Sequence, residues 1–289
     1  MGALTQNFWI GCALWGYKPW VGSFFPPESR SIHFLALYSE RFTAVEGNTT
    51  FYSVPDAPTI ARWVRDTPSG FRFCPKFPKA VTHKGLLQPQ IAEAMQFIER
   101  MQGLGDRLGP LFIQLPPRYS PAAWDDLSQF LTQLSHMGVE IALEVRHLDW
   151  FESVQGDRLN ALLSSLQVGR VLLDTRPIYE TPNDPQLEVE RKKPKVPAVF
   201  DIMAPFSLIR YISHPTWAMN QRFLQDWSKV VAQGLQDGKR IYFFVHCPVE
   251  ERSPANARSI QQMFEQQGLA LPALPWNHIE PPSTQLNLL

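Results

Sequence analysis

The chain has 289 residues and no net charge at pH 7, with 44% hydrophobic and 19% charged residues. This composition is typical of a globular protein and excludes a global electrostatic attraction to nucleic acid or to an anionic membrane. Three cysteines without close pairing favour reduced thiols over disulfides. The sequence shows no secretory signal and no apolar run of about 18 residues. We therefore expect a cytoplasmic protein without a membrane segment.

Short apolar runs alternate with segments of helical character along the chain. The expected strands are Phe8–Cys12, Thr43–Gly47, Phe71–Lys76, Pro110–Leu115, Val139–Arg146, Val168–Asp174, Ser207–His214 and Ile241–Cys247. The expected helices are Ser29–Arg41, Ala57–Asp66, Pro89–Gln102, one that begins at Ser120, Asp157–Leu166, Trp217–Gly234 and Pro254–Gln267. This alternation predicts an α/β, single-domain (β/α)8 TIM-barrel-like fold over residues 1–289, since such barrels typically have about 250 residues.

An open, doubly wound sheet is the structural alternative. Gly11 to Gly16 has neither the GxGxxG nor the GxxxxGK[ST] spacing, so a nucleotide-binding sheet lacks its best signal. A long loop insertion is expected at about 177–206, where the basic run ERKKPK lies. A loop of this length in a compact domain is usually functional or disordered, and a lid or a partner-binding arm would be its function.

Polar residues gather at the predicted carboxyl ends of the strands, where barrel enzymes place their chemistry. Because side chains alternate along a strand, parity predicts an inward-facing polar ring after apolar inward residues such as Ala44, Ala142 and Leu172. The ring comprises Glu46, Asn48, Cys74, Lys76, Gln114, Glu144, Arg146, Asp174, Arg176, Arg210, His214 and His246. Buried polar groups are costly unless paired, so the ring implies either a self-contained ionic network or a ligand.

Four cations in this ring, Lys76, Arg146, Arg176 and Arg210, suit a carboxylate or phosphate, so a small anionic ligand is expected. Glu46 and Glu144 are the candidates for acid and base, and Lys76 could instead act as a desolvated nucleophile. Further ligand-binding candidates follow the strand ends or join the ring: Trp15, Trp20, Asn48, Tyr52, Gln114, His147, Trp150 and Asp174. Each of the aromatic ones is equally compatible with packing.

No cofactor is predicted, but a divalent metal is weighed as an alternative. Neighbouring first and eighth strands would bring Cys12 near His246 and Cys247, and thiol with imidazole suits zinc. If a metal is present, Glu144, His214 and His246 are the expected ligands. No HExxH or paired CxxC motif supports this alternative.

Several segments together resemble one known family. They are GCALWGYKPWVGSFFPP at 11–27, FTAVEGNTTFYSVP at 42–55, FRFCPKFPKAVTH at 71–83, LGPLFIQLPP at 108–117 and IALEVRHLDWF at 141–151. They resemble the YecE-like family, domain of unknown function 72, over nearly the whole chain. The resemblance implies a TIM-barrel-like fold in one domain and no established activity. It highlights most of the residues above, together with Thr50, Phe51 and His83. The segments Arg210–Pro215 and Val245–Pro248 depart from the family pattern.

These observations lead us to expect an enzyme of hydrolase or lyase type that acts on a small anionic or sugar-like molecule at the carboxyl ends of the strands. One alternative is a nucleic-acid-binding or repair-like barrel that uses the basic loop Arg191–Lys195. Another is a ligand-binding barrel without catalysis. The residues leave the reaction and the oligomeric state open.

Overall fold

The computed structural model describes residues 7–182, 185–186 and 192–279. Parallel strands alternate with helices along it, as expected. The strands are β1 (Phe8–Cys12), β2 (Ala44–Gly47), β3 (Arg72–Pro75), β4 (Leu111–Gln114), β5 (Ile141–Glu144), β6 (Gly169–Asp174), β7 (Phe206–Ile212) and β8 (Arg240–His246). Six of them form one parallel sheet in the order β1-β8-β7-β6-β5-β4, while β2 and β3 form a separate parallel pair. The fold is therefore α/β with a six-stranded half-barrel sheet.

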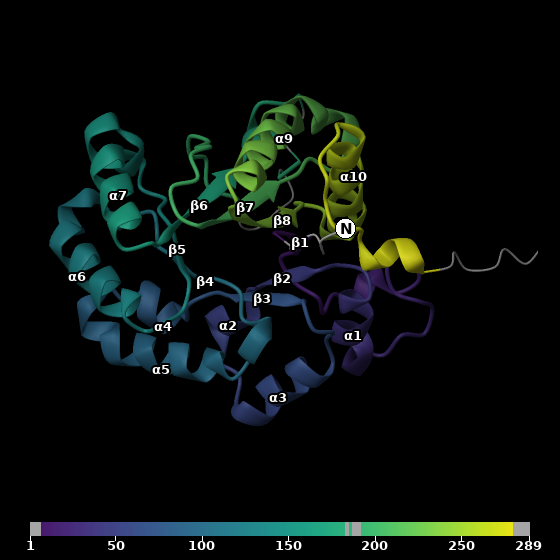
Figure 1. Cartoon of the computed structure of the whole chain (residues 1–289), viewed down its shortest axis with the longest axis horizontal. Coiled ribbons are helices and arrows are strands. Elements are labelled where there is room, and N and C mark those ends of the chain that lie inside the picture. Colours follow the sequence, from purple (N-terminus) through teal and green to yellow (C-terminus); the bar gives the residue numbers. More distant parts are fainter. Residues whose placement is uncertain (1–6, 183–184, 187–191, 280–289) are drawn as a thin grey trace, which may run out of the picture.

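The longer helices lie outside the strands, as Figure 1 shows. They are α1 (Phe34–Ser39), α3 (Ala57–Arg65), α5 (Ile91–Gln102), α6 (Trp124–Ser135), α7 (Ser153–Ser165), α9 (Gln221–Gln236) and α10 (Ser253–Gln266). Three further helices, α2 (Thr49–Tyr52), α4 (Lys79–Thr82) and α8 (Arg176–Tyr179), have one turn each and are too short for a periodicity to reveal them. In the part of the chain that the structure describes, no helix combines the length and the apolar character needed to cross a bilayer.

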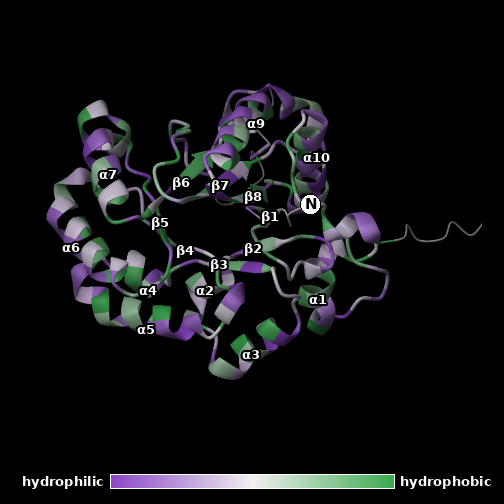
Figure 2. Ribbon diagram, viewed as in Figure 1, coloured by the Kyte–Doolittle hydropathy of each residue, from purple (hydrophilic) through white to green (hydrophobic). Residues whose placement is uncertain are grey.

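Two hydrophobic layers follow from the alternation of side chains along the strands. One layer lies between strands and helices and includes Ile10, Phe97 and Phe243. The other gathers inward residues from many strands, namely Trp9, Ala44, Cys74, Phe112, Ala142, Val171, Ala204, Phe206, Leu208, Tyr242 and Phe244. Figure 2 shows the matching pattern on the ribbon, with apolar and polar residues interspersed along each outer helix. The inner layer is thus packed with side chains and supports a polar layer at the strand ends.

A tyrosine hydroxyl occupies the junction between β1 and β2. The Cys12 N–H donates to Tyr38 Oη at 2.6 Å, and this hydroxyl donates to the Ala44 carbonyl at 3.0 Å. Nearby, Thr43 N–H donates to the Ile10 carbonyl at 3.2 Å, and Thr43 Oγ1 accepts from Ile10 N–H at 2.9 Å. Side-chain hydroxyls therefore take the place of part of a regular backbone ladder here.

Backbone hydrogen bonds connect β3 with β4 across the second junction. Gly109 N–H donates to the Phe73 carbonyl at 2.8 Å, and Phe77 N–H donates to the Phe112 carbonyl at 3.0 Å. Lys76 and Phe112 also form an isolated parallel bridge. The carboxyl ends of β3 and β4 are thereby held side by side.

The described part of the segment between β6 and β7 contains a single helical turn and otherwise no helix or strand. Its first residues, Arg176 to Tyr179, form α8, and β7 already begins at Phe206. Arg191, at one end of the predicted basic loop, lies outside the described residues. Lys193 and Lys195 are described, and the Lys195 amine lies 5.6 Å from the centre of the Tyr179 ring.

Candidate functional site

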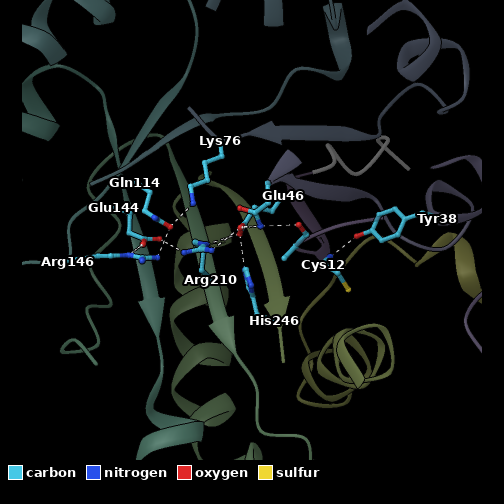
Figure 3. Close-up of polar contacts among 11 residues, drawn as sticks. Cys12, Tyr38, Glu46, Lys76, Gln114, Glu144, Arg146, Arg210 and His246 are labelled. Carbon is cyan, nitrogen blue, oxygen red and sulfur yellow. Dashed lines mark hydrogen bonds and ion pairs between the residues drawn. The ribbon is translucent and has the colours of Figure 1, made fainter. Parts of the chain in front are cut away.

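Arg210 occupies the centre of a buried ionic network at the carboxyl ends of the strands. Its Nε and Nη2 donate to the two oxygens of Glu46 at 2.8 and 2.9 Å, which is a bidentate pair. Its Nη1 donates to Glu144 Oε2 at 2.5 Å. Figure 3 shows Arg210 between the two glutamates. Each of the three nitrogens of this guanidinium therefore donates to a carboxylate, and the side chain is only 6% exposed.

A second chain of contacts extends from Glu144 to a lysine. Arg146 donates from Nε to Glu144 Oε1 at 2.6 Å and from Nη2 to Gln114 Oε1 at 2.6 Å. Lys76 Nζ donates to the same Gln114 oxygen at 3.0 Å, and it lies 4.0 Å from the centre of the Phe51 ring. One amide oxygen thus accepts from two cationic side chains.

Two neutral side chains complete the surroundings of Glu46. His246 Nε2 lies 2.9 Å from Glu46 Oε2, and Asn48 Nδ2 donates to Glu46 Oε1 at 2.7 Å and to the Ala13 carbonyl at 3.0 Å. An ionised carboxylate only accepts, so the imidazole donates here. Burial lowers the pKa of His246 to about 4, against the opposing attraction of Glu46, so the ring is neutral at pH 7.

Both glutamates are held ionised. Burial alone raises the pKa of Glu46, but Arg210 and His246 outweigh burial and leave the pKa well below its usual value. Burial also opposes ionisation of Glu144, yet Arg146 and Arg210 lower its pKa to about 2. The same pairing raises the pKa of Arg210 despite burial. Neither carboxylate is poised to exchange a proton near neutral pH.

Lys76 is the group in the network that can exchange a proton near pH 7. The pKa of its amine falls from 10.5 to about 7, chiefly because of burial and then because of Arg210, while Glu144 and Glu46 oppose the shift. Its side chain pairs with no carboxylate among the described residues, and the residue is only 7% exposed. A desolvated amine beside guanidinium groups is the usual origin of a reactive lysine.

Three titratable residues near this network were not among the residues that parity selected. Burial lowers the pKa of His83 to about 4, with Lys76 and Arg146 adding to the effect. Burial lowers the pKa of Lys193 beside Arg210 and raises that of Glu250 to about 7. These three residues lie several positions after a strand or in a loop, where alternation along a strand does not predict the direction of a side chain. The resemblance alone pointed to His83.

Asp174 and Arg176 do not join the network, contrary to the predicted inward orientation. In β6 the inward residue is Val171, whereas Leu172 belongs to the outer layer, so Asp174 also points outward. Its Oδ2 accepts from Trp227 Nε1 at 2.7 Å and from Arg176 Nη2 at 2.8 Å, and Arg176 Nη1 donates to Asp226 at 2.9 Å. These residues fasten α9 to β6.

The aromatic residues predicted to contact a ligand pack against other side chains or lie at the surface. Trp15 stacks edge-on against Trp63, with ring centres 5.1 Å apart. Trp20 and Trp150 are fully buried and donate from their indole nitrogens to the Glu250 and Tyr119 carbonyls. Tyr52 is 72% exposed. Among polar candidates, His147 Nδ1 accepts from Asp149 N–H at 3.3 Å and caps a short 3-10 helix.

The residues considered for a metal are separated or already paired. Over residues 7–182, 185–186 and 192–279, no three His, Cys, Asp or Glu side chains form a group suited to a metal ion. Glu144 binds two arginines and His246 binds Glu46. His214 lies elsewhere: its Nδ1 accepts from Thr216 N–H at 2.9 Å, and its backbone N–H donates to Asn220 Oδ1 at 2.8 Å. Cys12 packs in the outer hydrophobic layer.

A cavity of about 780 Å³ lies at the opposite end of the strands from this network. Its lining includes Thr43 and Phe71, which precede β2 and β3, and Pro272 to His278 near the end of the described chain. Polar side chains such as Arg65 and Asp66 line it, but none of the network residues does. The cavity and the ionic network are therefore distinct features.

Comparison with known proteins identifies the relatives of this chain. Residues 9–279 match the family described as Protein of unknown function DUF72. The UPF0759 protein YecE of Escherichia coli is 33% identical over 253 residues, which cover 85% of this chain and 88% of that protein. The UPF0759 protein YunF of Bacillus subtilis is 28% identical over 155 residues, with coverages of 50% and 52%.

Solved structures are similar in fold. The crystal structure of a DUF72 family protein from Thermotoga maritima superposes with a TM-score of 0.66 at 18% identity, covering 90% of this chain and 100% of that one. One from Enterococcus faecalis gives a TM-score of 0.66 at 17% identity, with coverages of 90% and 98%. At these identities the likeness concerns the fold alone.

Proposed function

The chain belongs to the DUF72 family, whose function is unknown, and we propose that this member is an enzyme that acts on a small anionic or sugar-like molecule at the carboxyl ends of its strands. One observation carries the proposal. Six strands, or the residues just after them, contribute Glu46, Lys76, Gln114, Glu144, Arg210 and His246 to a single buried polar network. Barrel enzymes place their reacting groups at this face.

The proposal includes a closed, single-domain (β/α)8 barrel. Closure would join the β2–β3 pair to the six-stranded sheet at both of its edges. The hydrogen bonds between Ile10 and Thr43, and between Phe73 and Gly109, support this joining. In a closed barrel the six network residues surround one axis, which would give a ligand access from one end only.

We assign Lys76 the role of base or nucleophile, because burial and Arg210 lower the pKa of its amine to about 7, where it can exchange a proton near neutral pH. Arg146 would hold the anionic group of the ligand. Its side chain is 18% exposed, and its Nη1 has no hydrogen-bond partner among the described residues, whereas every nitrogen of Arg210 donates to a carboxylate and its side chain is 6% exposed. Gln114 fixes the relative position of the two cations.

Glu46 and Glu144 would then be positioning residues rather than the acid and base expected from the sequence. Their low pKa values leave them ionised, and their oxygens are occupied by Arg210, Arg146, His246 and Asn48. A general acid needs a proton to give at the working pH. A glycosidase-like pairing of these two carboxylates is therefore not the mechanism we favour.

The test is a thermal-stabilisation screen of the full chain with carboxylated, phosphorylated and neutral sugar-like metabolites. We expect an anionic compound to raise the melting temperature in the wild type and to lose this effect in Arg146→Gln. The matched control is Arg62→Gln, an exposed arginine on α3, which should retain the effect. Equal stabilisation of Arg146→Gln and wild type would overturn the assignment of the anion to this site.

A further inference from the structure

We propose that Lys76 forms an imine with a small aldehyde or ketone that carries a neighbouring carboxylate. This inference rests on the proposed function, because it names the substrate class for the same site. It adds a covalent step and a reactive functional group, the carbonyl, that the anion-binding argument does not require.

The position of the Lys76 amine supports this inference first. Nζ contacts the neutral Gln114 oxygen at 3.0 Å and the face of the Phe51 ring at 4.0 Å. In the described part of the chain, the carboxylates of Glu46 and Glu144 pair with arginines and the histidine, not with this amine. A buried lysine without a counter-ion loses little by becoming a neutral, nucleophilic amine. The ring face favours the cation, but burial and the nearby guanidinium groups outweigh it.

The position of Arg146 supports the carboxylate on the ligand. Arg146 Nη2 and Lys76 Nζ both donate to Gln114 Oε1, at 2.6 and 3.0 Å, so the two cationic side chains are separated by a single acceptor atom. Imine formation therefore requires that a carboxylate held by Arg146 bring its adjacent carbon to the neighbouring Nζ. A carbonyl compound with its carboxylate on the next carbon matches this short spacing.

The chemical step needs no oxidant, reductant or metal. The lone pair of the neutral amine attacks the carbonyl carbon and forms the C–N bond, while a proton moves from nitrogen to the former carbonyl oxygen. The C–O bond of this carbinolamine then breaks as nitrogen donates its lone pair, and the hydroxyl takes one proton from a solvent acid and leaves as water. The resulting protonated imine withdraws electrons from the adjacent bond, which is the activation that lyase chemistry uses.

The experiment treats the full chain with glyoxylate and sodium borohydride near pH 7, and propionaldehyde serves as the neutral comparison. We expect glyoxylate to leave one reduced carboxymethyl adduct, mapped by peptide mass spectrometry to Lys76. The amount on Lys76 should exceed that on exposed Lys79 by roughly tenfold or more, because burial and Arg210 lower the pKa of the Lys76 amine to about 7 and so raise its share of neutral, nucleophilic amine. Propionaldehyde should show a smaller preference for Lys76.

Two variants make the outcome decisive. Lys76→Met should lose the adduct, and Lys79→Met, three residues along the chain, should keep it. Adducts distributed over the exposed lysines with Lys76 unmodified would overturn the inference. The proposed function would survive that result if anion stabilisation still depended on Arg146, and it would fail separately if Arg146→Gln bound the anion like wild type.

Discussion

Arg210 is the shared counter-ion of two buried carboxylates, which would otherwise repel each other. A charge removed from water costs several kcal/mol, and here one guanidinium offsets that cost for both Glu46 and Glu144. We expect Arg210→Met to lower the free energy of unfolding by about 3–5 kcal/mol, because both glutamates lose their shared partner. Urea titration measures this loss.

The control for Arg210→Met is Arg62→Met on the exposed face of α3. It removes the same charge from a solvated position, where such changes usually stay within about 0.5 kcal/mol. A loss for Arg210→Met as small as that of the control would mean that Glu46 and Glu144 find other partners or protonate.

Parity along regular strands predicted most of this network. Glu46, Gln114, Glu144 and Arg210 each follow a small or apolar inward residue, and the structure brings their side chains together. The sequence could not predict which of these side chains pair, since alternation along a strand gives the direction in which a side chain points but not its distance from another side chain. Two of the arginines expected to bind a ligand donate to carboxylates instead, Arg210 to glutamates and Arg176 to aspartates. Lys76 remains as the reactive group of the network.

At the scale of elements, the junction between β1 and β2 depends on Tyr38 from α1. Its hydroxyl accepts from Cys12 N–H and donates to the Ala44 carbonyl, both of which are fully buried. We expect Tyr38→Phe to lower the free energy of unfolding by about 1–3 kcal/mol, because two buried backbone groups lose their partner without any loss of ring packing. Thermal or urea unfolding measures the change.

Tyr52→Phe is the matched control, because the Tyr52 side chain is 72% exposed and its loss of a hydroxyl should leave stability unchanged. Native-state hydrogen exchange at Cys12 gives a second measurement, and we expect faster exchange of its amide in Tyr38→Phe. Unchanged exchange would indicate that water or a shifted strand replaces the phenol.

The order and type of the elements were predictable, but the orientation of β6 was not. All eight expected strands are present, because each is an apolar run between turn-forming segments. Fully buried strands have apolar side chains on both faces, so Val171, Leu172 and Leu173 give no sign of which side is inward. Asp174 was consequently assigned to the site, whereas it holds Trp227 of α9.

For the whole molecule, the buried amine of Lys76 makes stability depend on pH. The unfolded chain takes up a proton on this amine below its ordinary pKa of about 10.5, and the folded chain only below about 7. Between these values the unfolded state binds more protons, so the free energy of unfolding rises with pH by up to about 1.4 kcal/mol per pH unit. This contribution is fully present at high pH and is lost as the pH falls toward 7.

Lys76→Met removes this dependence, so we expect the variant to be more stable than wild type near pH 7 and the difference to shrink by roughly 2–3 kcal/mol between pH 7 and 9. Urea titrations of both proteins across this range measure the difference, in which the titration of Cys12, Cys74 and Cys247 cancels because both proteins carry these thiols. Lys79→Met should follow the wild type at every pH. A constant difference between Lys76→Met and wild type would mean that the amine keeps its ordinary pKa, and the case for a neutral nucleophile at the centre of this fold would lose its electrostatic basis. The expected result, in which Lys76 lowers the free energy of unfolding at neutral pH, fits an active site, because catalytic residues are often kept at the expense of stability.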